Sequence, residues 1–156
     1  MCGGSIMIWA AVSWDGRSEI NFTRRTMNSN QYLDILKQNI FKNKSHQYTD
    51  SGKIFMQDNA SVHCAKIIME SFEKKKINIL PFPVRSPDLN IIENVWSMLS
   101  QKVYQNGKQY NSHSELKKGI LKSWNELNIK KIKKLYDSLP DRVFKTIINS
   151  GGFSVY

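Results

Sequence analysis

The first 23 residues show the hydrophobic pattern of a β-hairpin. Residues 5–14 (SIMIWAAVSW) are β-branched and aromatic and lack a helical period, which predicts a buried strand. Asp15-Gly16 is a strong short-range turn signal, and residues 17–23 (RSEINFT) alternate enough to form the returning strand. The sequence therefore predicts a hairpin over residues 5–23.

The next segment has the period of a helix. Asn28 or Ser29 can cap its first turn, and the apolar pattern continues to about residue 41. Residues 43–53 are polar and contain Ser51-Gly52, so they are expected to form a loop. The buried stripe of this helix is predicted to consist of Tyr32, Leu33, Leu36 and Ile40.

Residues 53–82 show the order strand, helix, strand. Residues 53–58 (KIFMQD) form a short apolar run that ends in a carboxylate, as expected of a buried parallel strand. Residues 61–75 have helical spacing, and residues 77–82 (INILPF) predict a second short strand. This order within about 30 residues predicts a βαβ unit with a parallel sheet. The apolar positions of the expected helix are Ala65, Ile68, Met69 and Phe72.

The chain is expected to be helical from residue 87 to about residue 150. Ser112 and Glu115 have the spacing of a capping box, Pro140 interrupts the pattern, and Gly151-Gly152 is a helix-stop signal. There is no internal repeat and no linker-like segment. We therefore predict one continuous α/β unit with a helical C-terminal third.

Composition excludes several classes of protein. Hydrophobic residues make up 40% of the 156 residues, which argues against disorder. No run approaches the roughly 18 apolar residues of a membrane span, and no signal-peptide pattern is present. Cys2 and Cys64 are too few for a disulfide scaffold or a structural zinc site. An intracellular soluble protein without a membrane partner is expected.

Charge adds a candidate partner. The net charge is +10, with +3 in residues 1–99 and +7 in residues 100–156. A basic surface favours polyanions, since each phosphate neutralised by Lys or Arg releases condensed counterions. Lysines that merely keep helix faces solvated explain the charge equally well. The candidate DNA-binding side chains are Lys117, Lys118, Lys122, Lys130, Lys131, Lys133 and Lys134.

Two carboxylates stand out by their positions. Asp58 ends a predicted parallel strand, where sites of open α/β sheets form, although an Asp there can also cap the following helix. Glu93 is expected about 80° from the centre of its helix's apolar stripe, at the border of the packed face, where an ordinary boundary Glu is the alternative. Two such carboxylates can hold divalent cations for phosphoryl transfer. That stripe is predicted to be Leu89, Ile92, Trp96, Leu99 and Val103.

Three blocks give the chain a family resemblance. They are QDNA at 57–60 with His63, SPDLN at 86–90 leading into IENVW at 92–96, and GGSIMIW at 3–9. In this order, and with 34 residues between Asp58 and Glu93, they resemble the catalytic domain of Tc/mariner-type transposases of the DDE superfamily. The segment SLPDR at 138–142, followed by Gly151-Gly152, is similar as well, so the resemblance covers essentially the whole chain.

The resemblance implies a ribonuclease H-like mixed sheet flanked by helices. It also implies that Asp58 and Glu93 are the second and third catalytic carboxylates, which hold Mg²⁺ or Mn²⁺ while water and then a DNA 3′-hydroxyl attack phosphodiesters at transposon ends. DNA as partner and the nucleus as location follow from the same resemblance. For His63, which belongs to the family pattern, helix capping or hydrogen bonding is the expected role rather than catalysis.

The chain departs from the family pattern at several places. Ile91 stands where Pro is frequent and Arg85 where Gln is common. The family's first catalytic Asp lies on a strand before the Gly3-Gly4 segment, and here only Met1-Cys2 precede it. We therefore expect the C-terminal part of a catalytic domain, from a decayed element or a truncated gene model. Such a chain should cleave DNA weakly or not at all and be marginally stable, because the central strand is absent.

Three functional hypotheses remain open from the sequence. The first is part of a transposase whose reaction is metal-dependent DNA cleavage and joining. The second is a non-catalytic nucleic-acid-binding module that keeps the basic helices. The third is an interaction module that pairs with a full-length transposase or with itself. The four tryptophans, Trp9, Trp14, Trp96 and Trp124, are expected to be core and boundary residues rather than base-stacking platforms.

Overall fold

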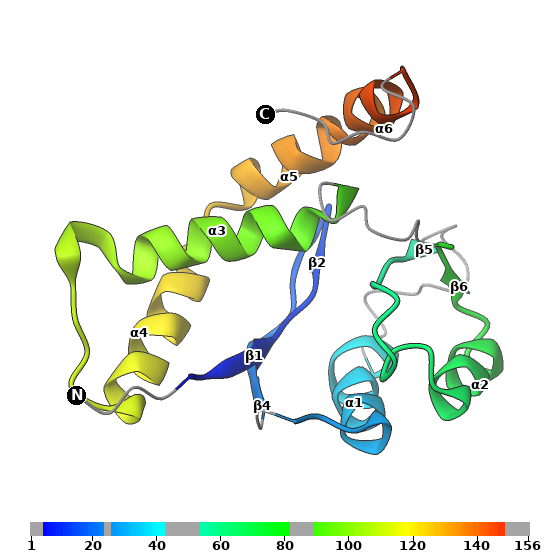
Figure 1. Cartoon of the computed structure of the whole chain (residues 1–156), viewed down its shortest axis with the longest axis horizontal. Helices are drawn as coiled ribbons and strands as arrows, with labels where there is room; N and C mark the ends of the chain where they lie inside the picture. The colour runs from blue at the N-terminus through cyan, green and yellow to red at the C-terminus, as the bar shows by residue number, and fades with distance from the viewer. Residues whose placement is uncertain (1–4, 24–25, 43–53, 82–88, 149–156) are drawn as a thin grey trace. The chain divides into compact units, whose positions relative to one another are not determined.

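The computed structural model describes residues 5–23, 26–42, 54–81 and 89–148 (Figure 1). The chain divides into two compact units. We call Met1–Phe22 with Pro87–Tyr156 the terminal unit and Thr23–Ser86 the middle unit, and each is described by itself. In the described part of the chain, no helix combines the length and the apolar character that crossing a membrane requires.

The N-terminal segment forms the predicted hairpin. Strand β1 (Met7–Trp9) pairs with β4 (Asn21–Thr23), and β2 (Val12–Ser13) pairs antiparallel with β3 (Gly16–Arg17). The hydrogen bond from the Ser18 N–H to the Ala11 carbonyl (2.8 Å) continues the pairing beyond β3. The hairpin prediction over residues 5–23 is therefore confirmed.

Two details of the hairpin prediction are wrong. Ser13 pairs with Gly16, so the turn residues are Trp14 and Asp15, one position earlier than expected. Gly16 does not use a positive φ, so the freedom of glycine is not what makes this turn. Residues 5–14 are also not a fully buried strand, because only Ala10 among them is buried and Trp14 is 45% exposed.

Four α-helices lie within residues 89–148, the described part of the region that the sequence predicts to be helical. A 3₁₀ turn at Gln105–Gly107, with positive φ at Asn106 and Gly107, reverses the chain after the first of these helices. Pro140 lies in the first turn of the last helix, where its missing N–H costs nothing. The helices are α3 (Ile91–Val103), α4 (His113–Asn125), α5 (Ile129–Asp137) and α6 (Leu139–Ile148).

The core of the terminal unit centres on Trp124 of α4. Its indole N–H donates to the Ser18 carbonyl of the hairpin (2.9 Å), and its ring stacks on Trp96 of α3 (5.8 Å between centroids). The Arg17 guanidinium lies 5.9 Å from the same ring. It donates to the carbonyl of Asn125, the last residue of α4, and to the carbonyl of Leu127 just beyond the helix (2.6 Å each). The buried residues around it include Ala10, Ile20, Ile91, Val95, Leu99, Val103, Ile120, Leu127 and Ile132.

The packed face of α3 differs from the predicted one. The fully buried residues are Ile91, Val95, Leu99 and Val103, whereas Ile92 and Trp96 are half-buried and Leu89 precedes the helix. On a helix of about 100° per residue, this places Glu93 about 140° from the centre of the buried stripe. The prediction that Glu93 borders the packed face is therefore wrong, and Glu93 lies on the exposed side.

The N-terminus of α4 is capped as predicted, with one difference. The Ser112 hydroxyl accepts from the Glu115 N–H (3.1 Å), which is half of a capping box. The Glu115 carboxylate accepts instead from the Asn111 N–H (2.8 Å), one residue before the cap. The Lys102 ammonium of α3 forms a hydrogen-bonded ion pair with the Glu126 carboxylate at the end of the same helix (3.0 Å). The hydrogen bond from Lys102 lowers the pKa of the exposed Glu126 carboxyl.

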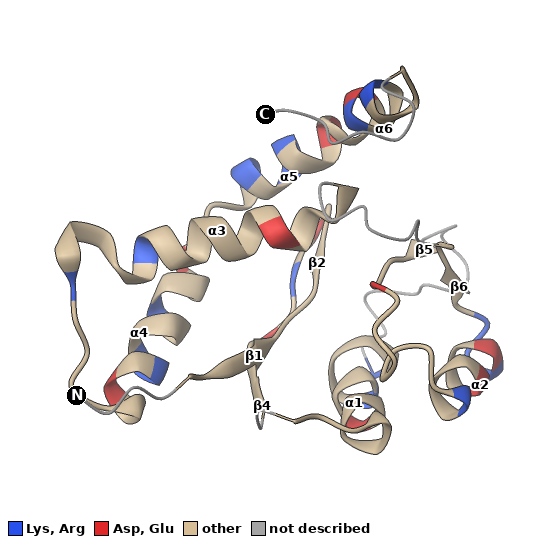
Figure 2. Ribbon diagram, in the orientation of Figure 1, with Lys and Arg blue, Asp and Glu red and all other residues tan. Residues whose placement is uncertain are grey.

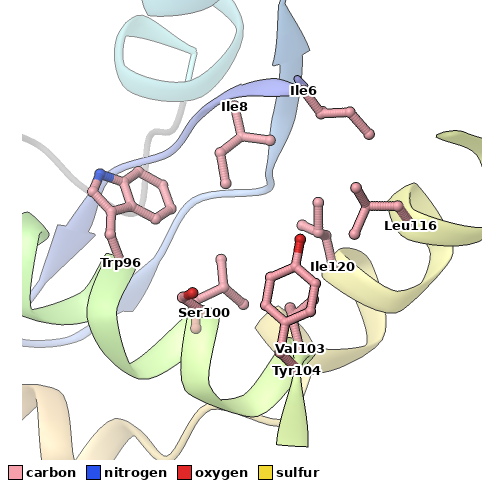
Figure 3. Close-up of a pocket in the computed structure, with 9 residues that line it drawn as sticks. Ile6, Ile8, Trp96, Ser100, Val103, Tyr104, Leu116 and Ile120 are labelled. Carbon is pink, nitrogen blue, oxygen red and sulfur yellow. The ribbon is translucent and has the colours of Figure 1, made fainter. Parts of the chain in front are cut away.

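An apolar cavity of about 350 Å³ lies between the hairpin, α3 and α4 (Figure 3). Apart from the Ser100 and Tyr104 hydroxyls its lining is aliphatic or aromatic, so it offers no acid, base or metal ligand to a reaction. The lining residues are Ile6, Ile8, Trp96, Leu99, Ser100, Val103, Tyr104, Leu116 and Ile120.

Gly119 allows α4 to approach Tyr110 closely. A Cβ at Gly119 would lie 2.4 Å from the Tyr110 Oη and 2.6 Å from its ring, and that hydroxyl donates to the Val103 carbonyl (2.9 Å). We expect Gly119→Ala to lower the free energy of unfolding by about 1–3 kcal/mol, despite the better helix propensity of Ala. Chemical denaturation measures this. Gly16→Ala is the control, since a Cβ there meets nothing within 4 Å, and equal losses in both variants would contradict the prediction.

The middle unit opens with the predicted helix. Helix α1 (Ser29–Leu36) continues into a π-helical turn at Lys37–Phe41. Asn28 is the N-cap, and it exchanges hydrogen bonds with Gln31 in a complete capping box (2.9 and 3.0 Å). The predicted stripe is confirmed, because Tyr32, Leu33, Leu36 and Ile40 are all buried.

The βαβ prediction is also confirmed. Strands β5 (Ile54–Phe55) and β6 (Asn78–Ile79) are parallel, with Ile54 opposite Asn78 and Phe55 opposite Ile79. The connecting helix α2 (Lys66–Lys74) begins later than the predicted residue 61, because residues 61–64 form a turn. Ile68 and Phe72 are buried, and the Phe72 ring packs on Phe55 (5.0 Å) and Phe41 (5.5 Å). This packing positions the chain that leaves β5.

Candidate metal-binding carboxylates

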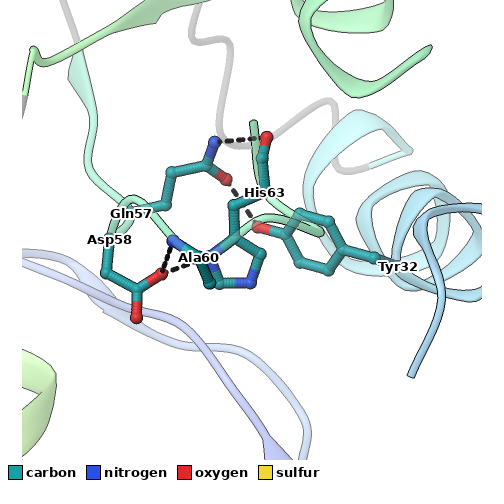
Figure 4. Close-up of polar contacts among 5 residues, drawn as sticks. All are labelled: Tyr32, Gln57, Asp58, Ala60 and His63. Atoms are coloured by element: carbon teal, nitrogen blue, oxygen red, sulfur yellow. Dashed lines mark hydrogen bonds and ion pairs between the residues drawn. The ribbon is translucent and has the colours of Figure 1, made fainter. Parts of the chain in front are cut away.

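Asp58 lies three residues beyond the carboxyl end of β5, and its side chain is 55% exposed. Its Oδ1 accepts a hydrogen bond from the Ala60 N–H (3.1 Å), which closes a tight local turn (Figure 4). Helix α2 has Ala65 at its N-cap, without a side-chain cap. The alternative that Asp58 caps α2 is therefore wrong, and the carboxylate instead shapes the segment between strand and helix.

His63 makes the second contact with the same carboxylate oxygen. Its Nδ1 lies 2.5 Å from Asp58 Oδ1, and its side chain is 17% exposed. The hydrogen-bonding role expected for His63 is confirmed. Asp58 Oδ2 has no hydrogen bond or ion pair with any described residue, so it is available to bind water or a cation.

Two further side chains hold His63 in place. The Tyr32 ring packs against the imidazole (4.4 Å between centroids, 35° between planes), and the Tyr32 hydroxyl donates to Gln57 Oε1 (2.7 Å). Gln57 Nε2 in turn donates to the His63 carbonyl (3.2 Å). Figure 4 shows the resulting ring of contacts, which runs from α1 to the end of β5 and back.

Sequence reasoning missed the roles of Tyr32 and Gln57. The helical period predicts only that Tyr32 lies on the buried stripe of α1. A signal was present, because a Tyr on an otherwise aliphatic stripe must place its hydroxyl against a polar partner when it is buried. The identity of that partner, 25 residues away in sequence, has no local signature.

Glu93 lies in the first turn of α3 and is exposed. A carboxylate there complements the partial positive charge of the helix N-terminus. Its neighbour Asn94 accepts a hydrogen bond from the buried Arg142 of α6 (2.7 Å), which anchors this turn of α3. The Glu93 carboxylate makes no hydrogen bond or ion pair with the residues that the structure describes.

The donor chemistry of both carboxylates suits a small divalent cation. Mg²⁺ takes few protein carboxylates and completes its shell with water and phosphate oxygens. Asp58 and Glu93 are both exposed, and neither is neutralised by a described Lys or Arg. Asp58 belongs to the middle unit and Glu93 to the terminal unit. Within residues 5–23, 26–42, 54–81 and 89–148, no three His, Cys, Asp or Glu side chains form a metal-binding group.

The seven candidate lysines lie on α4 and α5 of the terminal unit (Figure 2). These two helices together contain only two acidic residues. Two of the seven contact aromatic rings. Lys117 Nζ lies 5.1 Å from the Phe22 centroid, and Lys133 Nζ lies 5.4 Å from that of Trp14. The five that remain, all exposed, are Lys118, Lys122, Lys130, Lys131 and Lys134.

Comparison with known proteins identifies relatives along the whole chain. The Tc3 transposase of Caenorhabditis elegans is 38% identical over 149 residues, which are 96% of this chain and 45% of that protein. The Tc1 transposase of the same organism is 28% identical over 153 residues, 97% of this chain and 54% of that protein. The chain thus spans about half the length of the curated relatives it matches.

Solved structures agree on the fold. The catalytic domain of Mos1 mariner transposase superposes with a TM-score of 0.82 at 18% identity, over 96% of this chain and 76% of that one. The expected ribonuclease H-like α/β fold is therefore confirmed. The family model of the DDE superfamily endonucleases matches residues 2–117. The chain belongs to the DDE superfamily endonucleases, in the Tc/mariner transposase branch.

Proposed function

We propose that this chain forms part of a transposase catalytic domain that cleaves and joins DNA with Mg²⁺ or Mn²⁺. Asp58 and Glu93 are the proposed metal-holding carboxylates. One observation carries the proposal: Asp58 emerges from the carboxyl end of β5 with one oxygen fixed by its own turn and the other oxygen open. That is the position at which open α/β sheets build their sites.

The proposed role of each residue follows from the chemistry of its side chain. A bound divalent cation would supply an activated attacking oxygen and stabilisation of the leaving oxygen. Asp58 Oδ2 and the Glu93 carboxylate are the proposed ligands, and the lysines of α4 and α5 would bind the phosphate backbone of DNA. Positioning and charge neutralisation suffice for such a reaction, without a covalent enzyme intermediate.

Structures of a related transposase support this proposal. The Mos1 catalytic domain has been solved with Mg and with Mn, and Mos1 transposase with a transposon end. For this chain the metal, the DNA and a nuclear location remain proposals, as does pairing with a full-length transposase or a second copy.

Nicking of supercoiled plasmid in Mn²⁺ tests the proposal. We expect slow nicking by this chain and faster nicking by a longer form that adds the family's first aspartate. Asp58→Asn or Glu93→Gln should remove it in both forms while DNA binding is retained, because each change removes a metal ligand but no phosphate contact.

Asp34→Asn is the matched control, since Asp34 is an exposed carboxylate of the same middle unit that pairs with Lys37 (3.3 Å). Nicking by Asp58→Asn at the rate of the longer parent chain would refute the proposed role of Asp58.

A second function is supported by the seven lysines of α4 and α5. The positive charge of these helices is what a non-catalytic DNA-binding module requires. Such a module would bind DNA equally well in the presence and absence of Mn²⁺. Neither this chain nor the longer form would then nick DNA.

A further inference from the structure

The two oxygens of the Asp58 carboxylate have different surroundings. Oδ1 receives both described contacts, from the Ala60 N–H (3.1 Å) and from His63 Nδ1 (2.5 Å). Oδ2 receives none from a described residue. A carboxylate bound through one oxygen cannot rotate freely about its terminal bond, so Oδ2 is held in one direction.

His63 is itself held from two sides. Its ring packs on Tyr32, which is 1% exposed, and its carbonyl accepts from Gln57. The Tyr32 hydroxyl fixes that same Gln57 amide (2.7 Å). The imidazole is thus anchored to the core of the middle unit through the buried Tyr32 of α1, whereas Asp58 is more than half exposed. Such support matters most for an exposed carboxylate, whose side chain would otherwise sample several rotamers.

We infer that His63 is a positioning residue for Asp58: its Nδ1–H holds Oδ1 so that Oδ2 alone is presented to a divalent cation, with Tyr32 and Gln57 fixing the imidazole. This inference rests on the proposed metal-binding function. The arrangement resembles the outer-shell hydrogen bonds that orient metal ligands, whose loss typically weakens metal affinity by about 10–100-fold.

Two variants of His63 separate hydrogen bonding from packing. His63→Phe keeps a ring against Tyr32 but loses the Nδ1 donor. His63→Asn loses the ring but keeps an N–H donor close to the Nδ1 position. Mn²⁺ affinity is measured from the paramagnetic broadening of amide signals around Asp58 in the intact chain. The amide spectrum in the absence of metal reports whether each variant is folded.

We expect His63→Phe to weaken Mn²⁺ binding at least about tenfold and His63→Asn to stay within about threefold of the parent chain. A role in packing alone predicts the reverse order, and that result would overturn the inference. Equal affinity of His63→Phe and the parent would overturn it as well. A parent chain with no Asp58-dependent Mn²⁺ binding would overturn both the inference and the proposed metal-dependent function.

A metal-free measurement decides the hydrogen bond by itself. Long-range ¹H–¹⁵N spectra of the imidazole are expected to show a protonated Nδ1 in His63. A neutral ring with its proton on Nε2 alone would overturn the inference even if the proposed metal-dependent function held.

Discussion

Affinity of this chain for duplex DNA is expected to fall by about 10²–10³-fold between 50 and 200 mM salt. The estimate follows from the five exposed lysines of α4 and α5 that contact no aromatic ring. Five phosphate contacts give a slope of about −4.5 in a plot of log K against log salt. The binding should be weak and independent of sequence, because lysine recognises the phosphate backbone as a point charge.

A charge-matched pair of variants locates the binding surface. Replacement of Lys130, Lys131 and Lys134 by Gln should reduce the slope by about 2.7. Replacement of Lys66, Lys74 and Lys75, in or next to α2, by Gln changes the net charge equally but should leave the slope nearly unchanged, because α2 itself carries two lysines and two glutamates. Equal effects of the two triple variants, measured by fluorescence anisotropy, would show that only net charge matters.

Truncation of Trp124 is expected to lower the free energy of unfolding more than the other substitutions proposed for this chain. Trp124→Ala removes a side chain that is 1% exposed, its hydrogen bond to Ser18 and its stack on Trp96. Large-to-small changes of this kind cost about 3–5 kcal/mol, against a typical total of about 5–15 kcal/mol. Thermal unfolding followed by circular dichroism should show a midpoint at least about 10 °C lower.

Trp14 provides the control of the same chemical type. It is 45% exposed at the tip of the hairpin, where it contacts Lys133 and the edge of Tyr136 (6.5 Å). Trp14→Ala should cost no more than about 1.5 kcal/mol. If both variants lost the same stability, the hairpin tip would have to belong to the core, and the packing described for Trp124 would be refuted.

Local signals predicted local structure well. The caps at Asn28 and Ser112 and the stripe of α1 follow from side chains within one or two turns of each other. The parallel pairing of β5 with β6 also follows, because a short apolar run on each side of a helix leaves few alternatives. The choice of Asp58 as a candidate metal ligand follows from its position at the end of such a run and from the family pattern.

The orientation of α3 could not be predicted in the same way. Ile91 and Val95 form one apolar row and Ile92 and Trp96 form the next, so periodicity allows either row to face the core. The structure buries the smaller pair and leaves Trp96 half-buried at the boundary, where its large ring stacks on Trp124. Glu93 therefore turned out exposed, since its direction depends entirely on that choice.

The single open oxygen of Asp58 has a consequence for the choice among alkaline-earth cations. Calcium commonly fills six to eight positions and readily takes both oxygens of one carboxylate, whereas magnesium needs near-octahedral geometry and keeps several waters. A carboxylate with Oδ1 already engaged by Ala60 and His63 can offer only monodentate ligation. If Asp58 holds the proposed cation, we therefore expect the turn after β5 to favour magnesium over the larger calcium ion, even before a second carboxylate is involved.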